Sequence, residues 1–131
     1  MALKFHHLAI ACKDIDKTAK IYEALGYVKG TTVWDKKQKV RLCMLESAGM
    51  PSIELVSNNM ESSPVSNIVS KNGVIPYHTC YSTNNIEKSI EELCRKGFML
   101  TVKPIEAILF SGRKIAFMYH RDSGLIELVE E

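Results

Sequence analysis

The first strand of the chain is predicted by an alternation of apolar and polar positions. Residues 5–12 alternate with a period of two, which places Leu8 and Ile10 on one face and His7 and Ala9 on the other. One face is therefore suited to a packed core, and the second carries a histidine beside a small residue. We predict a half-buried β-strand over this segment.

A helical pattern follows this strand. From about Asp14 to Leu25 the apolar residues recur at helical spacing, at Ile15, Ala19, Tyr22 and Leu25. Gly26 is well placed to end the helix in a left-handed conformation. Three strand-like runs come next, at about 27–33, 39–46 and 51–56. The first part of the chain therefore predicts the order βαβββ.

The same order recurs further along the chain. A shift of 71 positions places His7 on His78, and the string Ile-Glu-Leu-Val occurs both at 53–56 and at 126–129. Chance similarity between amphipathic segments is an unlikely source of a histidine and an identical tetrapeptide in matching places. We conclude that the chain contains two copies of one module.

The second copy has its own helix and strand signals. Asn84 and Glu87 have the spacing of a capping box, and Gly97 is placed to end the helix. The strand-like runs lie at about 98–103, 113–119 and 125–129. Between the copies, Pro64 after a serine is placed to begin a short helix that Gly73 ends.

These elements predict an α+β fold of two tandem βαβββ modules. The modules span about 1–57 and 76–131, and a short helical linker joins them within a single domain, 1–131. A four-stranded sheet covered by one helix leaves its other face open. Two such modules can therefore form a cup-shaped site between them.

Four residues are candidates for chemistry in this cup. His7 and His78 occupy equivalent strand positions, and Glu54 and Glu127 lie between apolar residues that must pack beneath the helices. A carboxylate buried alone costs several kcal/mol, and a bound cation relieves that cost. A lone histidine or glutamate in a strand is usually structural. The recurrence of both in both copies favours a divalent metal site with two nitrogen and two oxygen ligands.

Composition narrows the class of protein. The 131 residues carry a net charge of +2 without a dense Lys/Arg cluster, which argues against a nucleic-acid partner. The N-terminus shows no apolar stretch suited to a signal peptide or a membrane span, so we expect a cytoplasmic protein without membrane association. His6 and His120 have no equivalents in the other copy and are predicted to be surface or loop residues. The cysteines are expected to be reduced core thiols: Cys12, Cys43, Cys80 and Cys94.

The chain resembles the vicinal oxygen chelate superfamily, which includes glyoxalase I, methylmalonyl-CoA epimerase, extradiol dioxygenases and bleomycin- and fosfomycin-resistance proteins. The resemblance covers essentially the whole chain. It is carried by the segments His7-Leu-Ala-Ile-Ala, Tyr22-Glu-Ala-Leu-Gly26, Ile53-Glu54-Leu-Val, Tyr77-His78-Thr-Cys and Gly124-Leu-Ile-Glu127-Leu. It implies that His7, Glu54, His78 and Glu127 bind a divalent metal ion such as Zn, Ni, Co or Mn.

The resemblance also implies an enzyme. Its reaction would be an isomerase or lyase reaction through a metal-stabilised enolate, on a small acyl thioester as in the epimerase or on a hemithioacetal as in glyoxalase I. In glyoxalase I a ligating glutamate moves the proton, a role that falls here on Glu127 or Glu54. The epimerase uses a further glutamate at a place where this chain has Lys37. Asp35, two residues earlier, is the candidate replacement.

Other residues are assigned to the substrate. Lys37, Arg41 and Arg113 are candidates for binding an anionic substrate, and Cys80 is placed to border the site. For each of the three cations, a solvated surface position is the competing interpretation. The alternative function is a metal-free binding or resistance protein of the same fold. We expect a homodimer, and superfamily members form the cup either within one chain or across two.

Overall fold

The computed structural model describes residues 2–58 and 63–131, which form two compact units. The N-terminal unit is His7–Tyr77, and the C-terminal unit is His78–Glu131 together with the described residues before His7. The predicted first module began at the chain start, whereas residues 2–6 belong to the other unit. Leu3 packs against the core of that unit, and Phe5 stacks edge-on against Tyr81 with ring centroids 6.0 Å apart.

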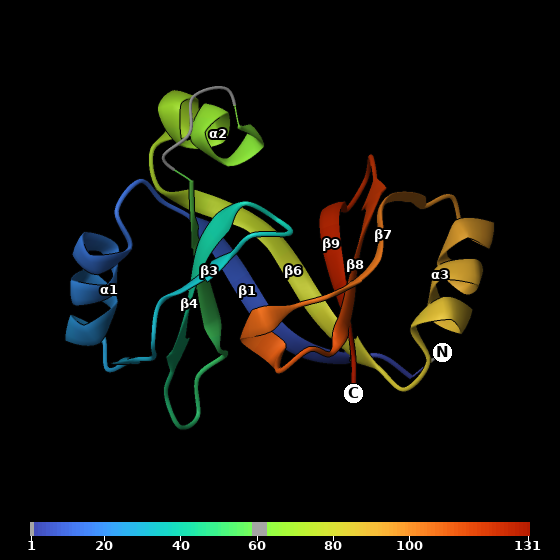
Figure 1. The fold of residues 1–131 in the computed structure, drawn as a ribbon, viewed down its shortest axis with the longest axis horizontal. Coiled ribbons are helices and arrows are strands. Elements are labelled where there is room, and N and C mark those ends of the chain that lie inside the picture. Colours follow the sequence, from blue (N-terminus) through green and yellow to red (C-terminus); the bar gives the residue numbers. More distant parts are fainter. Residues whose placement is uncertain (1, 59–62) are drawn as a thin grey trace. The chain divides into compact units, whose positions relative to one another are not determined.

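The N-terminal unit has the predicted βαβββ order with one strand divided. Its elements are β1 (Lys4–Ala11), α1 (Ile15–Ala24), β2 (Val28–Lys29), β3 (Val33–Asp35), β4 (Val40–Glu46), β5 (Ile53–Ser57) and α2 (Pro64–Asn72). The strand order is β2-β4-β5-β1, and β3 also pairs with β4. β1 and β5 are parallel, whereas the other pairs are antiparallel. In Figure 1, α1 lies along one side of these strands.

The C-terminal unit repeats this arrangement. Its elements are β6 (Ile75–Thr83), α3 (Ile86–Arg95), β7 (Met99–Glu106), a short 3₁₀ turn (Ile108–Phe110), β8 (Lys114–His120) and β9 (Gly124–Glu130). The strand order is β6-β9-β8-β7, with β6 and β9 parallel and the other pairs antiparallel. Because the first and last long strands of each unit pair in parallel, the predicted repeat is confirmed at the level of topology. Figure 1 shows α3 beside this second set of strands.

Each sheet has one face packed beneath its helix. In the N-terminal unit the core consists of Ile10, Cys12, Ile15, Ala19, Cys43, Leu45, Ile53 and Leu55. In the C-terminal unit it consists of Ile86, Leu93, Ala116, Met118, Ile126 and Leu128. We call this side of each sheet the helix face and the opposite side the second face. Side chains alternate along a strand, so the neighbours of these core residues lie on the second face.

The helix ends follow the sequence signals with one exception. The Asp14 carboxylate accepts from the Lys17 backbone N–H at 3.0 Å, and Gly26 follows α1 with a φ of +106°. For α3 the prediction of Asn84 as the cap is wrong. Asn85 is the cap, because its backbone is extended and its side chain accepts from the Lys88 N–H at 3.0 Å.

Two strands differ from their predicted extents. The run predicted at 27–33 is divided into β2 and β3, which both pair with β4. Lys29 faces Leu45 and Val33 faces Leu42, so the segment between β2 and β3 has one residue more than the part of β4 that it faces. The run predicted at 98–103 continues to Glu106 as β7, with two register shifts along its pairing with β8. In both cases the pairing with the neighbouring strand sets where the strand ends, and the local sequence pattern does not encode this pairing.

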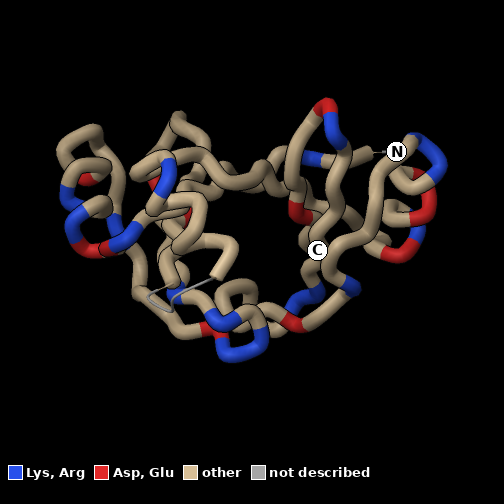
Figure 2. The backbone as a smooth tube through the Cα atoms, turned by 90° about the horizontal axis from the view of Figure 1, so that it is seen from above, with Lys and Arg blue, Asp and Glu red and all other residues tan. Residues whose placement is uncertain are grey.

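The helix surfaces carry both signs of charge. Figure 2 shows Lys, Arg, Asp and Glu interspersed along α1 and α3. Cys94 lies on the exposed surface of α3, so the prediction of a core thiol is wrong at this position, while Cys12, Cys43 and Cys80 are buried. In the part of the chain that is described, each helix is too short or too polar to cross a membrane.

Candidate metal centre

His7 and Glu54 lie on the second face of the N-terminal unit. Ala9 is the register partner of Glu54 on the parallel strand, and His7 is two positions before Ala9 on the same face. His7 Nε2 is 3.6 Å from Glu54 Oε1, and the two residues are only 0% and 2% exposed. The apolar neighbours of Glu54 pack under α1, as predicted.

His78 and Glu127 repeat the arrangement in the C-terminal unit. Cys80 is the register partner of Glu127, which places Cys80, Glu127 and His78 on one face of the β6–β9 pair. His78 Nε2 is 3.3 Å from Glu127 Oε1, with exposures of 5% and 2%. The apolar neighbours of Glu127 belong to the core under α3.

Phe117 adds a feature that sequence reasoning missed. It is the antiparallel partner of Glu127, and its ring meets the His78 imidazole edge-on with centroids 5.1 Å apart. An aromatic wall limits the directions available to the imidazole and keeps water from one side of it. The alternation along β8, which places Phe117 opposite the core residues Ala116 and Met118, could have identified it from the sequence.

The two His–Glu pairs have a donor set and spacing that suit a divalent metal. Ligand bonds of about 2.0–2.2 Å, at a tetrahedral angle, place two donor atoms about 3.3–3.6 Å apart. The nitrogen–oxygen distances of 3.6 and 3.3 Å fall in this range. Imidazole nitrogen with carboxylate oxygen is a combination that divalent transition metals accept. Each unit therefore supplies one buried nitrogen donor and one buried oxygen donor.

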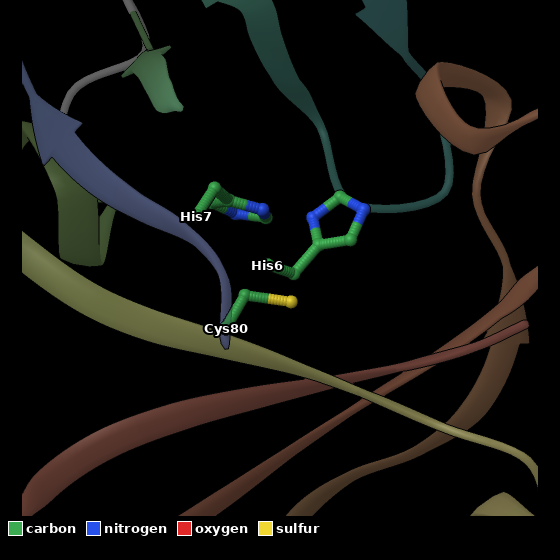
Figure 3. Close-up of side chains that lie close together, drawn as sticks. All are labelled: His6, His7 and Cys80. Carbon is green, nitrogen blue, oxygen red and sulfur yellow. The ribbon is translucent and has the colours of Figure 1, made fainter. Parts of the chain in front are cut away.

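Cys80 is fully buried on the same strand face as His78, next to Glu127 in register. His6 lies close to it, with ligand atoms of the two side chains within 4.8 Å, and Figure 3 shows both side chains. The prediction of His6 as a surface or loop residue is therefore wrong. It is half-buried in β1, and its ring stacks edge-on against Phe110 at 5.2 Å. His120 ends β8, is half-buried and accepts from the Asp122 N–H.

Asp35 shares the second face with Glu54, but its carboxylate is used by the adjoining turn. It is 3% exposed, and Oδ1 accepts from the backbone N–H groups of Lys37 at 2.9 Å and Gln38 at 3.0 Å. Oδ2 accepts from the Gln38 side-chain amide at 3.0 Å. Three donors explain how a carboxylate is accommodated in this buried position. Lys37 lies exposed in the same turn.

The two arginines predicted to bind substrate, Arg41 and Arg113, each lie over an aromatic ring. Arg41 is the register partner of Ser57 on the helix face of the N-terminal unit, opposite to the face of Glu54. Its guanidinium lies over the Trp34 ring at 5.8 Å from the centroid. Arg113 is exposed after the 3₁₀ turn, and its Nε donates to the Phe110 carbonyl at 3.1 Å.

Comparison with known proteins assigns the family. Residues 6–117 match the profile of the Glyoxalase/Bleomycin resistance protein/Dioxygenase superfamily, so the chain belongs to this superfamily and has its α+β glyoxalase-type fold. The chain is 26% identical over 133 residues to the uncharacterized protein YwkD of Bacillus subtilis (strain 168), with both chains fully covered.

Two solved structures extend the comparison. The hypothetical protein BH1468 from Bacillus halodurans C-125 has a TM-score of 0.86 at 25% identity, with 100% of this chain and 96% of that chain covered. A Streptomyces coelicolor methylmalonyl-CoA epimerase in complex with 2-nitronate-propionyl-CoA has a TM-score of 0.83 at 26% identity, with coverages of 99% and 96%. The buried His–Glu pairs are therefore found in a fold that includes an enzyme of acyl-CoA chemistry.

Proposed function

We propose that the chain is a divalent-metal-dependent isomerase that moves a proton at the carbon next to the carbonyl of a small acyl thioester. The observation that carries the proposal is the presence of one buried His–Glu pair at the equivalent place in each unit. The similarity to methylmalonyl-CoA epimerase supports the thioester as the substrate class.

In this proposal His7, Glu54, His78 and Glu127 together hold one ion. Two donors are fewer than divalent ions normally take from a protein, so each pair needs the other. When bound, the ion supplies a Lewis acid that polarises the substrate carbonyl and lowers the pKa of the adjoining C–H. The apolar residues on either side of each glutamate pack under the helix, which places its carboxylate on the second face.

Glu127 or Glu54 is the proposed proton carrier. Both carboxylates lie on a second face, where the apolar core beneath the helix holds their strands in place. Asp35 is the other candidate, but its oxygens already accept three hydrogen bonds from the turn. To take a proton from a substrate, this carboxylate would first have to give up hydrogen bonds that hold the turn together.

The hydrogen bonds that Asp35 accepts from the turn also favour a second candidate reaction, hemithioacetal isomerisation. That chemistry, as the resemblance to glyoxalase I implies, needs only a ligating glutamate as the base. It does not require a carboxylate in the turn that contains Lys37. Both candidate reactions exchange the hydrogen next to the carbonyl, so a single assay can test them together.

Deuterium wash-in tests this function. Metal-replete protein in D₂O is incubated with a 2-methyl-branched acyl-CoA thioester or with a hemithioacetal, and deuterium at the carbon next to the carbonyl is followed by NMR. We expect exchange with one substrate class, and a loss of about 10²- to 10⁴-fold in Glu127→Gln. Glu91→Gln, on the exposed surface of α3, is the matched control and should retain the full rate.

The binding-protein alternative gives the opposite result. Metal-replete protein would then exchange neither substrate, and Glu127→Gln would behave like Glu91→Gln. Wild-type protein that remains metal-free after incubation with Zn, Ni, Co and Mn would contradict the enzyme proposal directly. Homodimer formation is a separate prediction of the resemblance, which light scattering on the purified protein measures.

A further inference from the structure

A polar cavity lies on the helix face of the N-terminal unit, at the point where β1 leads into α1. Its volume is about 710 Å³. Three basic and three hydroxyl side chains contribute to its lining: Lys13, Lys29, Arg41, Thr31, Thr32 and Ser57. We call it the helix-side cavity. These residues come from the β1–α1 connection, from β2 and the loop after it, and from the ends of β4 and β5.

The helix-side cavity is separate from the His7–Glu54 pair. Arg41 and Ser57 are register partners, and both are on the side of the sheet that carries Cys43 and Leu55. Glu54 is on the other side of β5. A ligand in this cavity therefore contacts residues to which the proposed proton transfer gives no role.

The charges in the cavity favour an anion. Among the described residues, the Lys13 ammonium makes no ion pair or hydrogen bond, whereas the Lys29 ammonium donates to the Gly30 carbonyl at 3.2 Å and to the Thr32 hydroxyl at 3.3 Å. Two carboxylates also line the cavity. That of Asp14 accepts from the Lys17 N–H as the helix cap. That of Asp16 is 81% exposed and 3.9 Å from the Lys29 ammonium, a long contact that an incoming anion can replace.

Phosphate is the anion that this set of donors fits. Ammonium and guanidinium groups form charge-assisted hydrogen bonds with phosphate oxygens, and threonine hydroxyls add neutral donors at fixed positions. The ten-residue helix α1 begins at the cavity with Ile15, so the positive end of its dipole adds to the three cations. The volume of about 710 Å³ is large enough for a phosphate together with an organic group.

We propose that the helix-side cavity binds the phosphate groups of a small phosphorylated ligand. Lys13 and Arg41 contact the phosphate oxygens, and Lys29 turns from Asp16 towards them. The ligand has two chemical sources, a free organic phosphate or the nucleotide end of a coenzyme A thioester. The second source rests on the proposed function, and the first does not.

Trp34 provides the readout for this proposal. It is the only tryptophan of the chain, it is 46% exposed, and the Arg41 guanidinium lies over its ring. An anion that draws Arg41 towards the cavity changes the surroundings of this indole. Titration with inorganic pyrophosphate at constant ionic strength should therefore give a saturable change in tryptophan fluorescence.

A pair of lysine variants makes the test specific. Lys13→Gln should raise the Kd for pyrophosphate about tenfold or more, as loss of one charge-assisted contact predicts. Lys20→Gln, on the exposed surface of α1 outside the cavity, is the matched control and should leave the Kd unchanged. Arg41→Gln changes the surroundings of the Trp34 fluorophore, so the Kd of this variant is measured by calorimetry and should also rise. No saturable binding to wild type, or equal weakening by both lysine variants, overturns the proposal.

Coenzyme A and pantetheine separate the two sources by binding alone. If the cavity takes the nucleotide end of the thioester, coenzyme A binds at least as tightly as pyrophosphate, and Lys13→Gln weakens this binding. Pantetheine, which lacks the nucleotide, then gives no response. If the ligand is a free organic phosphate, pyrophosphate binding is sensitive to Lys13→Gln while coenzyme A binding is not. Pantetheine binding that depends on Lys13 would contradict a phosphate site altogether.

Discussion

Glu54 and Glu127 are buried to 2% exposure, and each lies beside a histidine. A buried carboxylate needs a partner that offsets its loss of hydration. A neutral imidazole offers at most one donor to it, whereas a divalent cation satisfies the carboxylate and the imidazole nitrogen together. At the scale of single residues, the two pairs are therefore better suited to metal binding than to a purely structural role.

Asp35 presents the contrasting case of a buried carboxylate with backbone donors. We expect Asp35→Asn to change proton exchange by less than about threefold, because the amide keeps an acceptor for the turn while a ligating glutamate moves the proton. The measurement is the deuterium wash-in rate, with circular dichroism to show that the turn variant is folded. A loss comparable to that of Glu127→Gln would instead assign the proton transfer to Asp35.

The cysteines provide a prediction on exposure. Cys94 is exposed, whereas burial raises the pKa of the Cys12 thiol from 9.0 to about 11. At pH 8 a thiol reagent such as DTNB should modify Cys94 rapidly and the buried thiols only after unfolding. Cys94→Ser should remove the rapid phase, and two rapid equivalents in wild type would contradict the structure.

The same thiol gives a direction for stability at high pH. The folded pKa of Cys12 lies above its unfolded value, so the unfolded chain loses this proton first as the pH rises. The contribution of Cys12 to stability is therefore complete below about pH 9 and is lost between pH 9 and 11. Urea unfolding across this range, with Cys12→Ala as the comparison, measures the change.

At the scale of elements, helix caps show how closely local sequence sets a boundary. We expect Asn85→Ala to lower the free energy of unfolding by about 1 kcal/mol, because it removes the acceptor for the Lys88 N–H at the start of α3. Asn84→Ala is the matched control, one residue away and outside the cap, with an expected change below about 0.5 kcal/mol. Equal losses in urea unfolding would show that Asn84 also caps the helix.

The elements also show what a single sequence can predict. Alternation placed His7, Glu54, His78 and Glu127 opposite the residues packed under the helices, because side-chain direction in a strand is a local property. The charge of Arg41 made it a candidate for an anionic substrate, whereas its register with Ser57, which sets the side of the sheet on which it lies, is not visible in the sequence. The predicted cap of α3, Asn84, was one residue away from the observed cap, Asn85, because two adjacent asparagines satisfy the same local signal.

At the scale of the whole chain, the repeat explains why each unit carries one His–Glu pair. Both units form the same strand order and place one His–Glu pair on equivalent strands. Neither pair resembles a complete site, since divalent ions in proteins usually take three or four side-chain ligands. A duplicated module that supplies two ligands per copy is thus expected to function only when both copies contribute.

The number of bound ions tests this expectation. If both pairs hold one ion, wild-type protein binds one ion per chain, and His7→Ala and His78→Ala each lose nearly all of it. If the pairs are independent sites, wild type binds two ions and each variant keeps one. His120→Ala, which changes a histidine outside both pairs, is the control and should retain the wild-type count. Mass spectrometry of the metal after dialysis gives the count.

Thermal unfolding with and without a chelator is the second readout, because an ion that binds only the folded chain raises its Tm. We expect the chelator to lower the Tm of wild type and of His120→Ala, and to leave that of His7→Ala and His78→Ala unchanged. A chelator effect that persists in either of these two variants would contradict a single shared site.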